Sequence, residues 1–125
     1  MKPLYALEGV VVHGLGNGHK VNMPTANLQL SPGLSFPPFG VYAARLTAEG
    51  KEYLGVTNVG LRPTLAGEQR PSIETFILDF QGDLYGKHIQ LYLYVLLRPT
   101  RKMASLEAVR DQVEKDAERT RALLG

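Results

Sequence analysis

A regular alternation of side chains near the C-terminal end constrains the fold of this chain more than any other feature. Large apolar residues stand at every second position, so that Ile89, Leu91, Leu93, Val95 and Leu97 alternate with His88, Gln90, Tyr92 and Tyr94. Successive side chains of a β-strand point to opposite faces, and the pattern therefore predicts a strand from His88 to Leu97 with one face in a core. Arg98 and Pro99 end it.

Four further segments are typical of strands because they are short, rich in β-branched and aromatic residues, and bounded by turn residues: Tyr5–Val12, Gly40–Thr47, Tyr53–Val59 and Ile73–Phe80. Turn-like clusters at 48–51 and 81–86 predict two hairpins between them. The intervening segments without periodicity are expected to be long loops, which are often functional: His13–Met23, Ser31–Phe39 and Gly60–Ser72. At least five antiparallel strands are therefore expected.

One amphipathic helix is expected from Ser105 to Leu124. Ser105 is a suitable N-cap, and Glu107 lies where a negative charge favours the helix dipole. The apolar residues form one stripe: Leu106, Val109, Val113, Ala117 and Leu124. We expect this helix to pack on the sheet, with a partner-binding helix as the alternative. Short strands, glycine turns and one closing helix favour a small barrel or sandwich.

Length and composition narrow the function classes. At 125 residues the chain is expected to form one domain spanning 1–125. The absence of cysteine excludes disulfides, zinc thiolate sites and thiol nucleophiles, and is compatible with a cytoplasmic location. The net charge of +2 is spread along the chain, so no nucleic-acid partner is expected. No segment approaches membrane-spanning length, so no membrane partner is expected either.

A glycine-rich loop followed by a proline turn is the first candidate site. The loop contains Gly14, Gly16, Gly18, His19 and Lys20. Glycine lets backbone amides approach an anion closely, and Lys20 adds a positive charge. Pro24 fixes the backbone just before Thr25 and Asn27, whose oxygens are ligands that Mg²⁺ accepts alongside substrate phosphates. The alternative is an ordinary glycine-rich hairpin and proline turn.

The histidines are too scattered for a zinc motif: His13, His19 and His88. His13 and His19 flank the glycine loop, where a phosphate contact and a plain surface role both remain open. The loop matches neither a Walker sequence nor a dinucleotide fingerprint, so any nucleotide binding must use another geometry.

Glu74 is the second candidate. By alternation along Ile73–Phe80 it shares a face with Phe76, Leu78 and Phe80, so its carboxylate points toward an apolar side. Such a carboxylate either has its pKa raised by desolvation or is compensated by a cation or hydrogen bond, and both are common at active sites. The alternative is a rim position in contact with water.

Residues along nearly the whole chain, in order, carry a family resemblance: Gly9, Val11, His13, Gly14, Gly18, His19, Lys20, Pro24, Thr25, Ala26, Asn27, Gly40, Val41, Tyr42, Asn58, Val59, Gly60, Arg62, Pro63, Thr64, Glu74, Thr75, Leu78, Asp79, Phe80, Tyr85, Gly86 and Lys87. On these residues the chain resembles the bacterial riboflavin kinases, which form the C-terminal module of the bifunctional flavokinase and FAD synthetase. The resemblance implies a mainly β fold, a small closed antiparallel, Greek-key-like barrel of about six strands with a C-terminal α-helix.

The resemblance also implies a reaction and its residues. The expected activity is transfer of the ATP γ-phosphoryl group to the ribityl 5′-hydroxyl of riboflavin, which gives FMN and ADP and requires Mg²⁺. Thr25 and Asn27 are expected to hold the metal, and Glu74 to act as the base that takes the hydroxyl proton. The expected nucleotide and phosphate contacts are Gly9, His13, Gly14, Gly16, Gly18, His19, Lys20, Pro24, Thr25 and Asn27, and the expected flavin contacts are Gly60, Arg62, Pro63 and Thr64.

The sequence departs from the family pattern at a few positions. The family commonly has Arg at the position of His19 or Lys20, Gly at Asn22, and often His at Phe76. The expected partners are riboflavin or FMN, ATP or ADP, and a fused or separate FAD synthetase module. The alternative is a non-catalytic flavin- or FMN-binding regulatory module, although retention of Thr25, Asn27 and Glu74 favours the enzyme.

Overall fold

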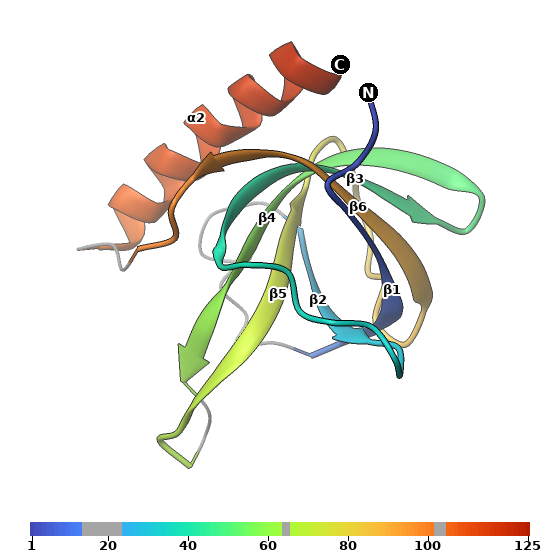
Figure 1. The fold of residues 1–125 in the computed structure, drawn as a ribbon. Coiled ribbons are helices and arrows are strands. Elements are labelled where there is room, and N and C mark those ends of the chain that lie inside the picture. Colours follow the sequence, from blue (N-terminus) through green and yellow to red (C-terminus); the bar gives the residue numbers. More distant parts are fainter. Residues whose placement is uncertain (14–23, 64–65, 102–104) are drawn as a thin grey trace.

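The computed structural model describes residues 1–13, 24–63, 66–101 and 105–125. Over these residues the chain forms six strands and one long helix, which are β1 (Tyr5–Val12), β2 (Thr25–Leu30), β3 (Gly40–Ala48), β4 (Lys51–Pro63), β5 (Gln69–Ile77), β6 (His88–Arg98) and α2 (Leu106–Leu124). All neighbouring strands are antiparallel, and they close into a barrel in the order β1-β2-β5-β4-β3-β6 (Figure 1). The expected closed antiparallel barrel with a C-terminal helix is confirmed.

The chain order within the barrel explains its Greek-key character. Strands β3, β4 and β5 follow one another as hairpins. Strand β2, which the connection 31–39 joins to β3, lies beside β5. This is the Greek-key arrangement of three sequential strands with a fourth placed next to the far one. The topology therefore brings β2 and β5 together although they are distant in sequence.

The alternating segment that predicted β6 lies between β3 and β1. Its residues Ile89, Leu91 and Leu93 are buried in the barrel interior. They pack there with inward-facing residues of the other strands, including Leu7, Leu28, Tyr42, Leu46, Val59, Ile73 and Ile77. One face of β6 is thus in a core, as the period of two predicted.

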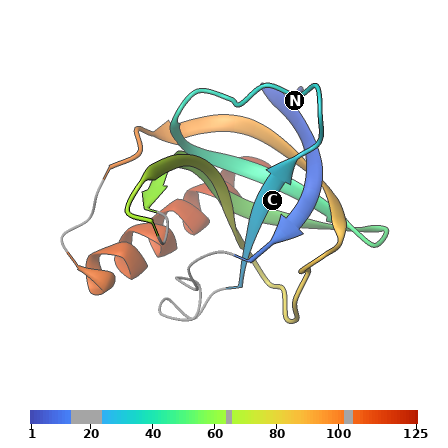
Figure 2. The same cartoon turned by 90° about the horizontal axis from the view of Figure 1, so that it is seen from below.

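A second apolar cluster lies between the outside of the barrel and α2. It joins Val41, Val56 and Phe76 of the strands to Val113 and Ala117 of the helix. Figure 2 shows the helix along the outside of the ring of strands. The predicted packing of the helix on the sheet is confirmed.

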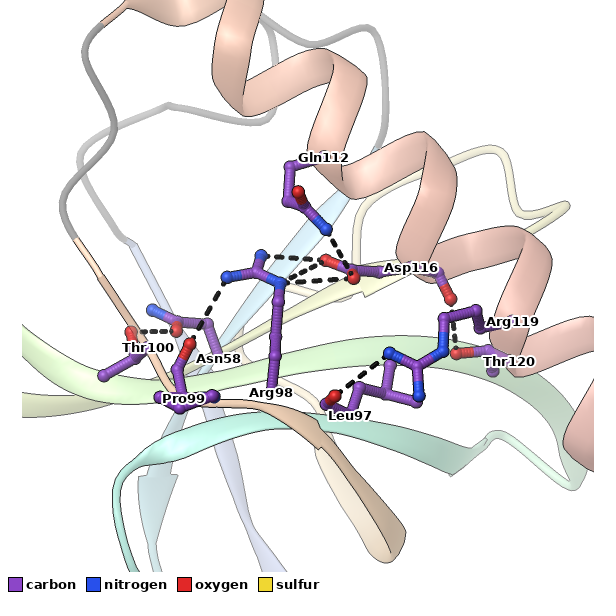
Figure 3. Close-up of polar contacts among 9 residues, drawn as sticks. All are labelled: Asn58, Leu97, Arg98, Pro99, Thr100, Gln112, Asp116, Arg119 and Thr120. Atoms are coloured by element: carbon purple, nitrogen blue, oxygen red, sulfur yellow. Dashed lines mark hydrogen bonds and ion pairs between the residues drawn. The ribbon is translucent and has the colours of Figure 1, made fainter.

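Polar contacts fix α2 on β6. Asp116 is fully buried, and its carboxylate accepts hydrogen bonds from Arg98 at 2.8 and 3.2 Å and from Gln112 Nε2 at 3.1 Å (Figure 3). The Arg119 guanidinium donates to the Leu97 carbonyl at 3.0 Å. The Ser105 side chain caps the helix by accepting from the Ala108 amide at 3.1 Å. These contacts hold the helix in a fixed position on the barrel.

Three segments differ from the sequence prediction. Residues 25–30 form a strand that was not predicted, and most of the predicted loop Gly60–Ser72 belongs to a long β4–β5 hairpin that projects beyond the other strands (Figure 1). Strand β5 ends at Ile77 instead of Phe80, because the chain turns at Asp79, whose φ is +56°. The strands of this hairpin contain proline and polar residues, so they lack the apolar alternation from which a strand is predicted.

Candidate active site

A row of polar side chains crosses three neighbouring strands on the outer face of the barrel. In the register of the sheet, Glu74 of β5 lies opposite Asn27 of β2 on one side and opposite Asn58 of β4 on the other. Directly opposed residues of antiparallel strands share a face, with Cβ atoms about 4.5–5.5 Å apart. The alternate residues, such as Ala26 and Ile73, belong to the interior cluster. The row therefore points away from the barrel core.

Thr25 extends this row at the start of β2. It lies opposite Phe76, two residues from Glu74 on the same face. The residue before it, Pro24, is joined to β5, because its carbonyl accepts a hydrogen bond from the Ile77 amide at 2.9 Å. Sheet pairing therefore places Thr25, Asn27 and Glu74 on one face of neighbouring strands.

Glu74 of β5 is a desolvated acid. Burial raises the pKa of its carboxyl, and the nearby charge of Arg62 lowers it by a smaller amount. Among the residues the structure describes, no side chain forms a hydrogen bond or ion pair with this carboxylate. Its neighbour on the same face is Phe76, which belongs to the apolar cluster beneath the helix. The carboxylate is consequently a better proton acceptor than an exposed one.

Arg62 connects the long hairpin to the row. Its guanidinium Nη1 lies 3.4 Å from Asn27 Oδ1, a long hydrogen bond. Asn27 itself is buried, with 7% of its surface exposed. Of the other residues predicted to contact flavin, Gly60 and Pro63 belong to β4, and Thr64 lies outside the described residues. The hairpin thus approaches the row through Arg62.

Two cavities flank the beginning of β2. One, of about 380 Å³, opens where β2 diverges from β5 after Asn27, and its lining includes Asn27, Arg62, Ser72, Phe36, Leu30 and Ile73. The other, of about 580 Å³, is lined by Pro24, Ile77, Leu78, Asp79, Phe80, Gln81 and Arg121. Both volumes fall within the range of small-molecule sites. The first cavity includes Asn27 of the polar row, and the second includes Pro24, the residue before Thr25.

The sequence profile of the family described as "Flavokinase: Riboflavin kinase" matches residues 1–124. The chain belongs to the riboflavin kinase family. The expected family is thereby confirmed over essentially the whole chain.

Relatives of known identity agree with this family. A bifunctional riboflavin kinase/FMN adenylyltransferase of Escherichia coli (strain K12) is 40% identical over 122 residues, which cover 97% of this chain and 38% of that protein. The homologous enzyme of Listeria monocytogenes is 36% identical over 94% of this chain and 38% of its own length. The chain therefore spans less than two fifths of the curated relatives it matches.

A solved structure also shares the fold. Riboflavin kinase from Trypanosoma brucei superimposes with a TM-score of 0.65 at 24% identity, over 95% of this chain and 76% of that one. At this identity the similarity supports the fold alone. In the part of the chain that the structure describes, no helix is both long enough and apolar enough to cross a membrane.

The oxygens of Thr25 and Asn27 fit the hard donors that a riboflavin kinase would need for Mg²⁺. They stand two residues apart on one face of β2, next to Glu74. Among the described residues there is no group of three His, Cys, Asp or Glu that could hold a metal ion. Mg²⁺ commonly takes one or two protein ligands and completes its shell with phosphate oxygens and water. The donor set matches that mode of binding and no all-protein cage.

The predicted phosphate loop cannot be placed. Gly14, Gly16, Gly18, His19 and Lys20 all lie outside the described residues. His13, just before them, is exposed and stacks on Tyr85 with ring centroids 3.7 Å apart. Gly9 lies in β1, where a Cβ would collide with the Gln29 backbone of β2, so close strand packing explains this glycine. The roles of all these residues stay predictions.

Asn58, which lies opposite Glu74, and Thr100, which is bonded to Asn58, were not among the predicted site residues. Asn58 belonged to the family resemblance but received no role, and Thr100 follows the end of β6. The Thr100 hydroxyl donates a hydrogen bond to Asn58 Oδ1 at 2.6 Å (Figure 3). Alternation within β4 was a usable signal for Asn58, because Thr57 and Val59 are both fully buried on the other face. No sequence signal connects Thr100 to it.

Proposed function

We propose that this chain is a riboflavin kinase that transfers the γ-phosphoryl group of ATP to the ribityl 5′-hydroxyl of riboflavin and releases FMN and ADP. The observation that carries the proposal is the position of Glu74, a desolvated carboxylate that lies opposite Asn27 on the outer face and has no hydrogen-bond partner in the described part of the chain. Membership of the riboflavin kinase family supports the substrates. The arrangement is suited to taking a proton from an alcohol beside a phosphate group.

The two cavities suggest how the substrates share the row. The nucleotide is assigned to the side of Pro24, with its phosphates directed to Thr25 and Asn27. The flavin is assigned to the side of Arg62, where the cavity lining is mostly apolar. Both reacting ends would then meet at Glu74. Such alignment contributes most of the rate enhancement in phosphoryl transfer.

Proton transfer is the part assigned to Glu74. Its carboxylate accepts the proton of the 5′-hydroxyl as that oxygen forms a bond to the γ-phosphorus, while the bond from this phosphorus to the β–γ bridging oxygen breaks and ADP leaves. Thr25 and Asn27 would hold Mg²⁺, which, when bound, neutralises charge on the phosphates. The raised pKa of Glu74 brings its basicity closer to neutral pH, where a general base is most effective.

One assay tests the function and its alternative. The protein is incubated with riboflavin, ATP and MgCl₂, and the flavins are separated by chromatography with fluorescence detection. We expect FMN and ADP in equal amounts, and no FMN when EDTA exceeds the metal. Tight flavin binding without FMN would contradict the kinase and support a non-catalytic flavin-binding module.

A further inference from the structure

Asn58 is held by a short hydrogen bond immediately beside the proposed base. It lies opposite Glu74 in the β4–β5 register, and its Oδ1 accepts from the Thr100 hydroxyl at 2.6 Å. Thr100 comes from the segment after β6, more than forty positions along the chain, as Figure 3 shows. The orientation of Asn58, which belongs to the same polar row as Glu74, is thus set by a residue outside the β4–β5 hairpin.

Hydrogen-bond chemistry determines what this contact leaves available. A carboxamide has one oxygen that accepts and one nitrogen that donates two hydrogens. Because Thr100 takes the oxygen, the nitrogen is the group left for other contacts. Within the described part of the chain, Asn58 Nδ2 has no hydrogen-bond partner. Its direct cross-strand neighbour is Glu74, an acceptor that also lacks a partner there.

The local backbone makes room for the contact. Gly60 is two residues from Asn58 on the same face of β4, and a Cβ at this position would lie 3.3 Å from Thr100 Oγ1 and 3.8 Å from Asn58 Nδ2. The first of these distances is tighter than ordinary packing, so a larger residue would displace the hydroxyl. Glycine at position 60 therefore fits the close approach of Thr100 to Asn58, which is a role separate from the flavin contact predicted for it.

We propose that Asn58 is a positioning residue for Glu74, and that Thr100 sets its orientation. The amide nitrogen of Asn58 lies in the side chain directly across the strand pair from Glu74, and although no hydrogen bond joins the two in this structure, it can donate to the Glu74 carboxylate and limit its rotation, so that one carboxylate oxygen stays directed to the substrate hydroxyl. The hydroxyl of Thr100 prevents the carboxamide from turning its oxygen toward the carboxylate. This inference rests on the proposed function, because it gives Asn58 a part in that reaction.

A double-mutant cycle tests the catalytic part. Thr100→Val keeps the side-chain shape and removes the hydroxyl, and we expect kcat for FMN formation to fall about 5- to 10-fold, the usual range for one lost hydrogen bond. Thr100→Ser should restore most of kcat. In the Glu74→Gln background, the same Thr100→Val change should cost less than 2-fold, because the carboxylate it orients is gone. An equal loss in both backgrounds would overturn the proposal, since it would mean that Thr100 acts independently of Glu74.

A measurement on the free protein keeps the inference separate from the proposed function. In ¹H–¹⁵N spectra, we expect the side-chain amide signal of Asn58 to shift both in Thr100→Val and in Glu74→Gln, with Glu114→Gln on the exposed face of α2 as the control. A signal that ignores Glu74→Gln would overturn the contact even if the protein makes FMN. If wild-type protein makes no FMN, the proposed function fails, and these spectra still decide whether Asn58 contacts Glu74.

Discussion

Two acids on the outside of the barrel are removed from water in opposite ways. Asp116, a residue of α2, has no exposed surface and is held by Arg98 and Gln112. Glu74, in the polar row, is desolvated enough to raise its pKa and has no hydrogen-bond partner among the described residues. A buried charge is costly unless it is paired. Pairing therefore marks Asp116 as part of the framework, whereas Glu74, which has no pair within the described residues, is the acid we assign to the substrate.

The largest expected effect breaks the comparison on the side of Glu74. Because positioned base catalysis contributes about 10²- to 10⁴-fold, Glu74→Gln should lower kcat for FMN formation by a factor in that range. Binding of ADP with Mg²⁺ should change little, as measured by calorimetry. Glu114→Gln, on the exposed face of α2, is the matched control. Unchanged turnover in Glu74→Gln would show that this residue is not the base.

The next effect concerns Asp116 and is one of stability. Asp116→Asn keeps the volume and removes the charge facing Arg98, so the free energy of unfolding should fall by about 2–3 kcal/mol. Urea denaturation measures the loss, with the exposed Asp111→Asn on the same helix as the control. A loss no greater than that of the control would mean that the Arg98 pair does not stabilise the seat of the helix.

A neutral polar pair inside the barrel tests whether the stability of a buried polar group depends on its having a partner. The Thr57 and Thr75 hydroxyls lie 2.7 Å apart and are fully buried. Thr75→Val alone leaves the buried Thr57 hydroxyl without its partner and should lower the free energy of unfolding by about 1–3 kcal/mol. Adding Thr57→Val removes both polar groups and should recover much of that loss. A double variant as unstable as the sum of the two single ones would contradict this reasoning.

The smallest effect is the dependence of stability on pH. The folded-state pKa of Glu74 is raised, so the folded protein binds this proton more tightly than the unfolded chain. The resulting stability is present at acid pH and is lost as pH rises through the folded-state pKa. The free energy of unfolding of Glu74→Gln minus that of the wild type should therefore be larger at neutral pH than at pH 4. A difference that does not change between these pH values would mean that the carboxylate is not desolvated.

Periodic segments of the sequence predicted much of the fold. The alternation from His88 to Leu97 and the capped stripe from Ser105 to Leu124 correspond closely to β6 and α2. Strand β2 was not predicted because Pro24 and Thr25 are typical of a turn, although Ala26 and Leu28 alternate with polar residues. Its pairing with β5 depends on barrel closure, which is not a local property of the sequence.

The candidate site was only partly predictable for the same reason. Glu74 stood out because a charged residue interrupts the apolar face of its own strand. The Asn58–Thr100 contact joins residues 42 positions apart, and the Arg98–Asp116 pair joins residues 18 positions apart, so both depend on how separate elements pack in the folded chain. Neither pair has a local pattern that a search along the sequence would detect.

The most direct test compares the two acids in one measurement. Single-turnover FMN formation is followed for Glu74→Gln and Asp116→Asn under conditions where unfolding curves show both variants to be folded, and each rate is divided by that of the wild type. We predict a loss of at least 100-fold for Glu74→Gln and less than 3-fold for Asp116→Asn. Equal losses, or a larger loss for Asp116→Asn, would contradict the assignment of the unpaired acid to the chemistry and the paired acid to the framework.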